Sequence, residues 1–293
     1  MKKQERLQKS KNIKQLEKQY RKMIINLADK HTQELITDYL KEFDSILLKH
    51  GLEAIQIKKG MDALNKLNYT FYVTSKKDLE ELVDEAIKFG QTAKAEGFKN
   101  YFQQVIPKFN NIPQLKEPLR VLFGGGFSDA IRKLVEQKRL EEGFDLSKSL
   151  WRYTKETQKQ IWRTIYDGLQ QNKSYSEVRR ELTQYLTEKG RANLSYNITR
   201  LYRTEVNNAF LTADKYVTQN TDFVEEVHIF RSPNGDPDCE ICNEIVGPVG
   251  GEGVIVPKNE AEYPSYHPNC MCDYVDVLPS PDDFIDYLKT LGG

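Results

Sequence analysis

The sequence is short of cysteine, tryptophan and long apolar runs. Only four of its 293 residues are cysteine, two are tryptophan and four are histidine. No run approaches the roughly 18 apolar residues that span a bilayer, and the charged start "MKKQERLQKSKNIKQLEK" is not followed by the apolar segment of a secretory signal. We therefore expect a soluble protein that has no membrane partner and is not exported by that route.

The composition is nevertheless that of a chain that can bury a core. Hydrophobic residues make up 39% of the sequence, with 16 Tyr and 13 Phe as bulky core material. Charged residues make up 29%, which is typical of a large solvated helical surface. The length allows one large domain or two ordinary ones.

A formal net charge of zero conceals two oppositely charged ends. Residues 1–24 carry nine Lys/Arg against two Glu, or +7, and residues 220–293 carry three Lys/Arg against fifteen Asp/Glu, or −12. Such asymmetry favours two different partners, with double-stranded DNA a candidate for the basic arm. The simpler interpretation of the arm is the solvated face of an amphipathic helix. The candidate DNA contacts are Lys2, Lys3, Arg6, Lys9, Lys11 and Lys14.

Helical periodicity dominates the first hundred residues. Apolar residues recur at steps of three and four from about Asn12 to His50, which predicts a long helix. Ser75 and Asp78 stand three apart ahead of a second periodic stretch, so a second helix is predicted to begin at Ser75 and to run toward Phe102. Three prolines then predict a broken connection: Pro107, Pro113 and Pro118.

The glycine-rich stretch "FGGGF" at residues 123–127 lacks the Gly-Lys-Ser/Thr ending of a phosphate-binding loop. Without that lysine and hydroxyl, nothing there would hold phosphate and magnesium. Glycines at a turn or at a tight approach of helices explain the stretch more simply.

Beyond these glycines the pattern is helical and then changes. Helices are predicted from Ser147 to about Gln219, one of them opened by a capping box of Ser174 and Glu177. After Asn220, "FVEEVHIF" alternates like a strand, "GPVGGEGVIVP" indicates a short hairpin or loop, and "SPDDFIDYLKTLGG" predicts a helix capped near Ser280.

We therefore predict a mainly α fold of the α+β class, with long helices followed by a small β/loop module. The predicted segments are an N-terminal helical region with a basic arm at 1–110, a central helical domain at 111–220, a zinc-binding module at 221–279 and a helical tail at 280–293.

Every cysteine lies in that module. Cys239 and Cys242 are separated by two residues, as are His267 and Cys270, and Cys272 follows closely. A turn with this spacing aims two ligands at one point, and a structural Zn²⁺ ion takes four thiolate or imidazole ligands. There are five candidates for four places, and either Cys272 or His267 could complete a set with the other three.

Two other uses of the cysteines are less consistent with their surroundings. A redox Cys-x-x-Cys pair normally opens a helix after a strand, whereas this one lies in a turn-rich segment after Pro and Asp. Structural disulfides need an oxidising compartment, and nothing in the chain indicates export. A zinc ion with a closed set of soft ligands would be structural, holding a module too small to fold by itself.

Several motifs together resemble one known family. Five motifs occur in this order: an aromatic-led helix "SLWRYTKETQKQIW", the helix start "NKSYSEV", then "LYRTEVNNAF", "DPDCEIC" and "HPNCMC". The ordered set resembles that of phage head morphogenesis proteins, the minor head proteins named for protein F of phage Mu. The resemblance covers about residues 145–275, and nothing in the N-terminal half shares it. Two departures are Met271, where the family usually has Arg, and the absence of a Trp upstream of "NGDPD".

The resemblance implies a family motif at Arg203, Thr204 and Glu205, and metal-ligand motifs at the residues already singled out. It implies a non-enzymatic minor component of a tailed-phage head, made in the bacterial host cytoplasm and carried in the virion. Portal protein, other head proteins and double-stranded DNA bound without sequence preference are the implied partners, and no small-molecule substrate is expected.

Two functions of other classes compete with this one. Arg203 followed by Glu260 and Glu262 resembles the Arg and Glu-x-Glu of ADP-ribosyltransferases, although a Ser-Thr-Ser-like strand motif is missing between them. The other alternative is a zinc-bearing DNA-binding module. Because Arg203 and Glu205 point in different directions from a helix, we instead expect each to pair with a neighbouring element and to pack the helical domain against the zinc module.

Overall fold

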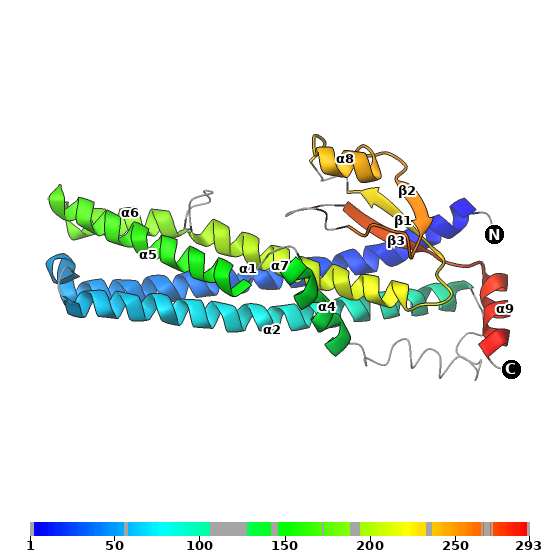
Figure 1. Ribbon diagram of the computed structural model, residues 1–293, viewed down its shortest axis with the longest axis horizontal. Coiled ribbons are helices and arrows are strands. Elements are labelled where there is room, and N and C mark those ends of the chain that lie inside the picture. Colours follow the sequence, from blue (N-terminus) through cyan, green and yellow to red (C-terminus); the bar gives the residue numbers. More distant parts are fainter. Residues whose placement is uncertain are drawn as a thin grey trace. The chain divides into compact units, whose positions relative to one another are not determined.

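Helices dominate the protein, and a small sheet lies near its C-terminus (Figure 1). The computed structural model describes residues 3–55, 58–105, 128–141, 146–171, 173–187, 194–232, 236–264, 266, 270 and 272–291. The predicted mainly helical α+β class is confirmed. Within these residues no helix is both long enough and apolar enough to cross a bilayer.

The two longest described helices are α1 (Lys3–Ile55) and α2 (Lys58–Val105). The shorter ones are α4 (Ser128–Glu141), α5 (Leu146–Gln170), α6 (Tyr175–Thr187), α7 (Leu194–Gln219), α8 (Glu240–Val246) and α9 (Pro281–Leu291). Three strands complete the described part: β1 (Glu226–Arg231), β2 (Val254–Pro257) and β3 (Cys272–Val277).

The predicted start of the second helix at Ser75 is wrong, because α2 begins at Lys58 and Ser75 lies within it, fully buried. The Ser75 carbonyl accepts a hydrogen bond from the Tyr202 hydroxyl at 2.8 Å, and Asp78 lies 2.5 Å from the His31 ring. The Ser-x-x-Asp pattern is therefore not a cap. Its polar side chains lie where neighbouring helices of a bundle meet.

The two caps predicted farther along the chain are confirmed. The Ser174 amide donates to the Glu177 carboxylate at 2.8 Å, and the Glu177 amide returns a bond to the Ser174 hydroxyl at 3.4 Å. Ser280 and Asp283 form the same reciprocal pair at the start of α9. These local pairs satisfy amides that a helix start leaves without an intrahelical acceptor.

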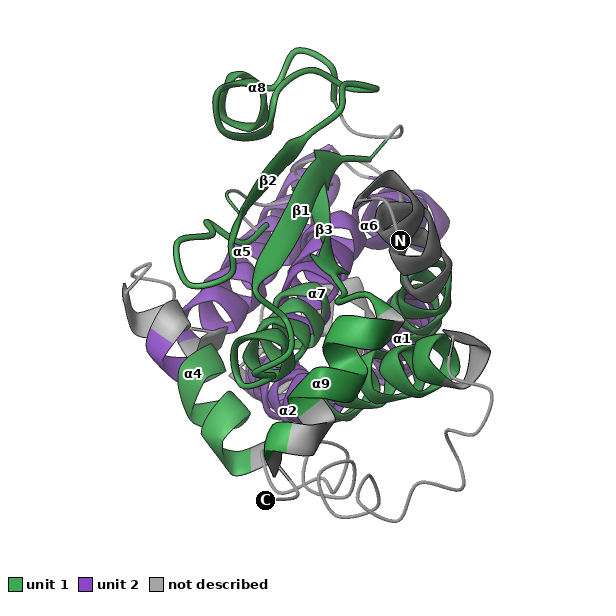
Figure 2. Cartoon of the chain, turned by 90° about the vertical axis from the view of Figure 1, so that its right-hand side faces the viewer, with its two compact units in different colours: residues 1–24, 84–135, 207–293 green, residues 25–83, 136–206 purple. Residues whose placement is uncertain are grey.

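The chain divides into two compact units, each assembled from separated segments (Figure 2). Unit 1 comprises residues 1–24, 84–135 and 207–293, and unit 2 comprises residues 25–83 and 136–206. The four consecutive segments expected from the sequence do not anticipate this division. Helices α1, α2, α4 and α7 each contribute one part to either unit.

Unit 1 contains the sheet, in the order β2-β1-β3 with both neighbouring pairs antiparallel. The predicted strand after Asn220 is confirmed as β1, and Arg231 at its end pairs with Cys272 of β3. A hydrophobic core gathers the end of α2, the chain before β1 and α9 around Phe98, Phe102, Phe223 and Phe284. This core packs the chain just before β1 and just after β3 against the helices of unit 1.

The described residues of unit 2 form helices, apart from 171, 173 and 174 between α5 and α6, and none of them is in a strand. Along α1 its buried side chains recur at steps of three and four, as the sequence predicted: Ala28, Thr32, Ile36, Tyr39 and Phe43. The Tyr39 hydroxyl bonds the Asn68 side chain at 2.8 Å, and Tyr72 packs edge-on against Trp151. The three prolines after α2 and the "FGGGF" stretch lie outside the described residues.

Candidate metal centre

Three cysteine thiols meet at one end of the sheet. Cys242 lies in the first turn of α8, Cys270 just before β3, and Cys272 is the first residue of β3. Their sulfurs all lie within 4.8 Å of one another, and each residue is at most 5% exposed. None of the four cysteines is in a disulfide. Two sequence motifs 28 residues apart therefore converge on one buried point.

The geometry and chemistry of these thiols fit a metal ion. The Cys242 and Cys270 sulfurs are 3.9 Å apart, close to the edge of about 3.8 Å that follows from tetrahedral bonds of about 2.3 Å to zinc. Burial raises the pKa of the Cys242 thiol to about 11, and the Cys270 hydrogen bond and then burial raise the pKa of Cys272. Without a cation the crowded sulfurs hold their protons, and a bound divalent ion would stabilise the thiolates instead.

The fourth ligand has two candidates. Cys239 is half-buried at the residue that precedes α8, packs against the cysteine cluster and hydrogen-bonds the Cys242 thiol. The Cys-x-x-Cys pair therefore does open a helix after a strand, contrary to the expectation of a turn-rich segment. The Cys239 sulfur is not part of the close group of three. His267, the other candidate, lies outside the described residues. Cys272 thus belongs to the cluster with Cys242 and Cys270.

Apolar side chains enclose the thiols. Val227 and Ile229 of β1 and Val246 of α8 are buried against them, with Tyr263 and Tyr266 packed around the edge. Burial, followed by the neighbouring sulfurs, raises the pKa of Tyr266. Among the described residues, the side chains around the thiols are apolar or aromatic and the metal-ligand donors are soft, buried and close to one another.

The outer surface of the same module is acidic. Seven carboxylate side chains between residues 236 and 264 are exposed: Asp236, Asp238, Glu240, Glu244, Glu252, Glu260 and Glu262. The segment has one lysine, Lys258, whose ammonium donates to the Thr221 carbonyl at 2.7 Å. Such a surface repels the phosphates of nucleic acid.

A second polar cluster in unit 1 was not expected from the sequence. Its ionisable side chains, each at most 4% exposed, are Lys14 and Glu17 of α1, Lys94 of α2, Asp214 of α7, and Asp273 and Asp276 of β3. The Lys94 Nζ lies 3.0 Å from carboxylate oxygens of Asp214 and of Asp276 and 3.3 Å from Glu17. The Lys14 Nζ lies 2.7 Å from both Glu17 and Asp273. Each buried charge therefore has a partner of opposite sign.

Neighbouring charges offset the effect of burial on the pKa of Lys94 and of Asp273. Burial by itself would lower the pKa of Lys94, but Asp214 and Asp276 hold it well above the ordinary value. Burial would likewise raise the pKa of Asp273, yet Lys14 and Arg21 keep it below the ordinary value. Glu17 differs, because burial and the nearby Asp214 raise its pKa despite the two lysines.

A glycine allows the helices to approach closely enough for these pairs. Gly90 lies one turn before Lys94 on α2, and a Cβ added there would stand 2.6 Å from the Phe210 carbonyl oxygen of α7. The missing side chain lets α2 lie against α7 in unit 1, within reach of Asp214. Thr218 of α7 also contacts the charge cluster, because its hydroxyl donates a hydrogen bond to Asp276 at 2.9 Å.

The charge cluster corrects one predicted DNA contact. Lys14 is buried against Asp273 and Glu17, with its ammonium 5.0 Å from the Tyr274 ring centre, so it serves the fold instead of facing DNA. Lys3, Arg6, Lys9 and Lys11 belong to α1, but their side chains are outside the described part, as is the whole of Lys2. Part of the basic arm is thus neutralised by the acidic end of its own chain.

The Arg-Thr-Glu motif lies on α7 in unit 2. Arg203 bonds Asp29 of α1 through two nitrogens, at 2.5 and 2.6 Å, which confirms that it pairs with a neighbouring element. That element is a helix, so the expectation that Arg203 binds the zinc module is wrong. Thr204 is half-buried and Glu205 is 2% exposed.

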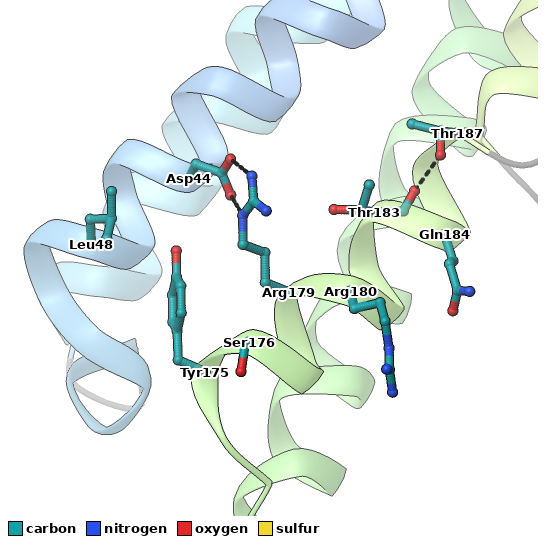
Figure 3. Close-up of a pocket in the computed structure, with 9 residues that line it drawn as sticks. All are labelled: Asp44, Leu48, Tyr175, Ser176, Arg179, Arg180, Thr183, Gln184 and Thr187. Carbon is teal, nitrogen blue, oxygen red and sulfur yellow. Dashed lines mark hydrogen bonds and ion pairs between the residues drawn. The ribbon is translucent and has the colours of Figure 1, made fainter.

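Unit 2 also has a shallow pocket between α1 and α6 (Figure 3), with a volume of about 610 Å³. Its lining includes Tyr175, Arg180 and Gln184, and Asp44 accepts two hydrogen bonds from Arg179. The described residues of the lining include no thiol or imidazole, and their one carboxylate, that of Asp44, is already bonded. The pocket shows no arrangement of nucleophile and base.

No family model matches the chain, and neither a curated protein nor a solved structure is significantly similar to it. The resemblance to phage minor head proteins stays a prediction from the motifs.

Sequence reasoning found the cysteines but missed Lys94, Asp214 and Asp276, because they come from distant segments without a recognisable spacing. Charged residues at positions of the helical periodicity that is otherwise apolar would have been the available signal.

Proposed function

We propose that this protein is a minor structural protein of a tailed-phage head, acting in head morphogenesis, with a structural zinc ion in its C-terminal module. The observation that carries the proposal is the convergence of thiols from both cysteine motifs at one buried point. These motifs also close the ordered set that resembles the family. Cys242, Cys270 and Cys272 would hold the ion, and Cys239 or His267 would complete its ligands.

A structural role for the metal follows from the surroundings of the thiols. Catalytic zinc keeps an open position for water or substrate, whereas these three cysteines are at most 5% exposed and enclosed by apolar side chains. The ion would lend a small module stability that its limited core does not supply. By holding the module rigid, the ion would present its acidic surface in a fixed form that another protein could recognise.

Portal protein and other head proteins are the proposed partners, in keeping with the acidic surface of the module. DNA contacts without sequence preference would fall to Lys2, Lys3, Arg6, Lys9 and Lys11 of the basic arm. An acidic surface around the cysteines does not favour the alternative of a zinc-bearing DNA-binding module. The pairing of Arg203 with Asp29 likewise gives no support to an ADP-ribosyltransferase function.

Mass spectrometry of purified phage particles, combined with metal analysis of the isolated protein, tests the proposal. We expect the protein in heads at low copy number with about one Zn²⁺ per chain. The gene should lie beside portal and scaffold genes. A host protein that is absent from particles would overturn the proposal, and NAD cleavage that is lost in Glu262→Ala would support the enzyme instead.

The arm is tested without removing the buried part of α1. Replacing Lys2, Lys3, Arg6, Lys9 and Lys11 by Gln should weaken DNA binding at low salt. The slope of log K against log salt concentration should become shallower by about 0.9 for each phosphate that the arm no longer neutralises. Because Lys14 and Arg21 are kept, unit 1 should stay folded. Unchanged DNA binding would exclude the arm from this role.

A further inference from the structure

A buried arginine links the two halves of the cysteine set. Arg231 ends β1, is 6% exposed, and pairs in the sheet register with Cys272 of β3. Its guanidinium donates one hydrogen bond to the Asn243 side-chain oxygen and another to the Asp236 carbonyl. One side chain therefore joins the strand beside Cys272 to the loop and helix that carry Cys239 and Cys242.

The loop contacted by Arg231 is itself well connected. The Cys239 amide donates to the Asp236 carbonyl at 3.3 Å, and the Asn243 amide donates to the Cys239 carbonyl at 3.0 Å. The Asn243 side chain also donates to the Pro237 carbonyl at 3.0 Å. Both acceptors of Arg231 thus bracket Cys239, and movement of the guanidinium would move the backbone of that cysteine.

We propose that Arg231 is a positioning residue of the metal centre, which sets Cys239 and Cys242 against Cys272, and that its buried positive charge, carried on the strand position that pairs with Cys272, offsets negative charge on the thiolates. This inference rests on the structural metal of the proposed function. Four thiolates around a divalent ion leave a net charge of −2, and three leave −1. A buried cation beside them lowers the free energy of that excess negative charge.

The shape of the guanidinium is essential to the first role. Its planar fork binds two acceptors in a fixed geometry, whereas the ammonium of lysine is a compact point charge. Arg231→Lys therefore keeps the charge and loses the fork, and Arg231→Gln loses both. Comparing the two separates positioning from charge compensation.

The test is metal binding by the full chain, measured as Zn²⁺ affinity in competition with a chromogenic chelator and as the absorption spectrum of the Co²⁺ form. Arg231→Gln should bind Zn²⁺ about 10–100-fold more weakly, the usual effect of losing a group that orients metal ligands. Arg231→Lys should lie between Arg231→Gln and the wild type, and its altered Co²⁺ spectrum should report a disturbed thiolate geometry.

Lys258→Gln is the matched control, because it removes one positive charge from the same module while its ammonium donates to the Thr221 carbonyl, outside the cysteine cluster. We expect it to bind both metals like the wild type. Wild-type affinity and an unchanged Co²⁺ spectrum in Arg231→Gln would overturn the role of Arg231. If Arg231→Gln does not fold, Asn243→Ala decides, since it removes one acceptor and should weaken Zn²⁺ binding; unchanged affinity there overturns the inference.

Failure of the metal centre is a separate result. Wild-type protein that binds neither Zn²⁺ nor Co²⁺ would overturn the metal and the role of Arg231 with it. Wild-type protein that binds metal while Arg231→Gln is unaffected would overturn the inference alone.

Discussion

Strand β3 takes part in two buried polar clusters built on different principles. Cys272 at its start belongs to the cysteine cluster, and Asp273 and Asp276 belong to the charge cluster. The carboxylates of the charge cluster are paired with two lysines of the same chain, so its cations are fixed parts of the fold. The cysteine cluster consists of thiols of raised pKa with no lysine or arginine among them, and it takes a cation from outside the chain only if the proposed metal binds there. The difference predicts that one end of the module depends on conditions outside the chain and the other does not.

Removal of the metal should have the largest effect on stability, and it should act on the cysteine cluster alone. A chelator, or Cys272→Ser, should unfold the segment around α8 and β2, because metal binding on the order of 10 kcal/mol appears as folding free energy in small zinc modules. Limited proteolysis should then cut between residues 236 and 264, while far-UV circular dichroism retains the signal of the long helices. A chelated protein with the wild-type melting temperature and cleavage pattern would contradict a structural metal.

Loss of Lys94 should have the next largest effect. Lys94→Met leaves three buried carboxylates without their shared cation, and breaking a buried ion pair in this way costs about 3–5 kcal/mol. Urea unfolding monitored by circular dichroism measures the loss. Lys77→Met is the control, because its pair with Glu81 is 79% and 66% exposed and such pairs contribute little. A loss below about 1 kcal/mol would show that Lys94 is not essential to the cluster.

The two clusters also differ in how well the sequence predicts them. The spacing of two cysteines within one turn is visible in the sequence without knowing the fold. It therefore predicts Cys242, Cys270 and Cys272 as candidate metal ligands, and these three thiols lie together in the structure. Lys94 meets Asp214 and Asp276 across three elements, and no spacing encodes that contact. Local capping rules succeeded at Ser174 and Ser280 for the same reason.

Sequence rules failed where tertiary contacts override local patterns. The Ser75 and Asp78 pattern has the form of a cap, but the surrounding helical periodicity continues through it and both residues bond other helices instead. DNA contact by Lys14 of the basic arm was one of two interpretations and is wrong, because net charge does not show that Lys14 meets Asp273 of the same chain. The helical class itself was predictable, since long periodic stretches such as α1 depend little on such contacts.

The pH dependence of stability should distinguish two carboxylates of the charge cluster, with a smaller effect than loss of Lys94. Asp273 has a lowered pKa, so its contribution is present above the unfolded value of about 3.9 and is lost as the pH falls below it. Glu17 has a raised pKa, so its contribution is present below about pH 4.3 and is lost as the pH rises through the folded value.

Asp273→Asn should therefore flatten the loss of stability in acid, and Glu17→Gln should flatten the loss that sets in above about pH 4.3. Urea unfolding at a series of pH values measures both slopes. Slopes that change in the same direction in both variants would contradict the opposite assignments.

The smallest effect is expected in unit 2, where an exposed ion pair contrasts with the buried cluster. Arg203 is about half exposed and Asp29 a quarter exposed, so water and salt screen their attraction. Arg203→Gln should lower the free energy of unfolding by about 0.2–1 kcal/mol at low salt, and most of that difference should vanish in 1 M NaCl, where the screening length falls to about 3 Å. Double substitution with Asp29→Asn isolates the pair energy. A loss as large as that of Lys94→Met would mean that the Arg-Thr-Glu motif holds unit 2 through contacts other than this pair, with buried Glu205 the first neighbour to examine.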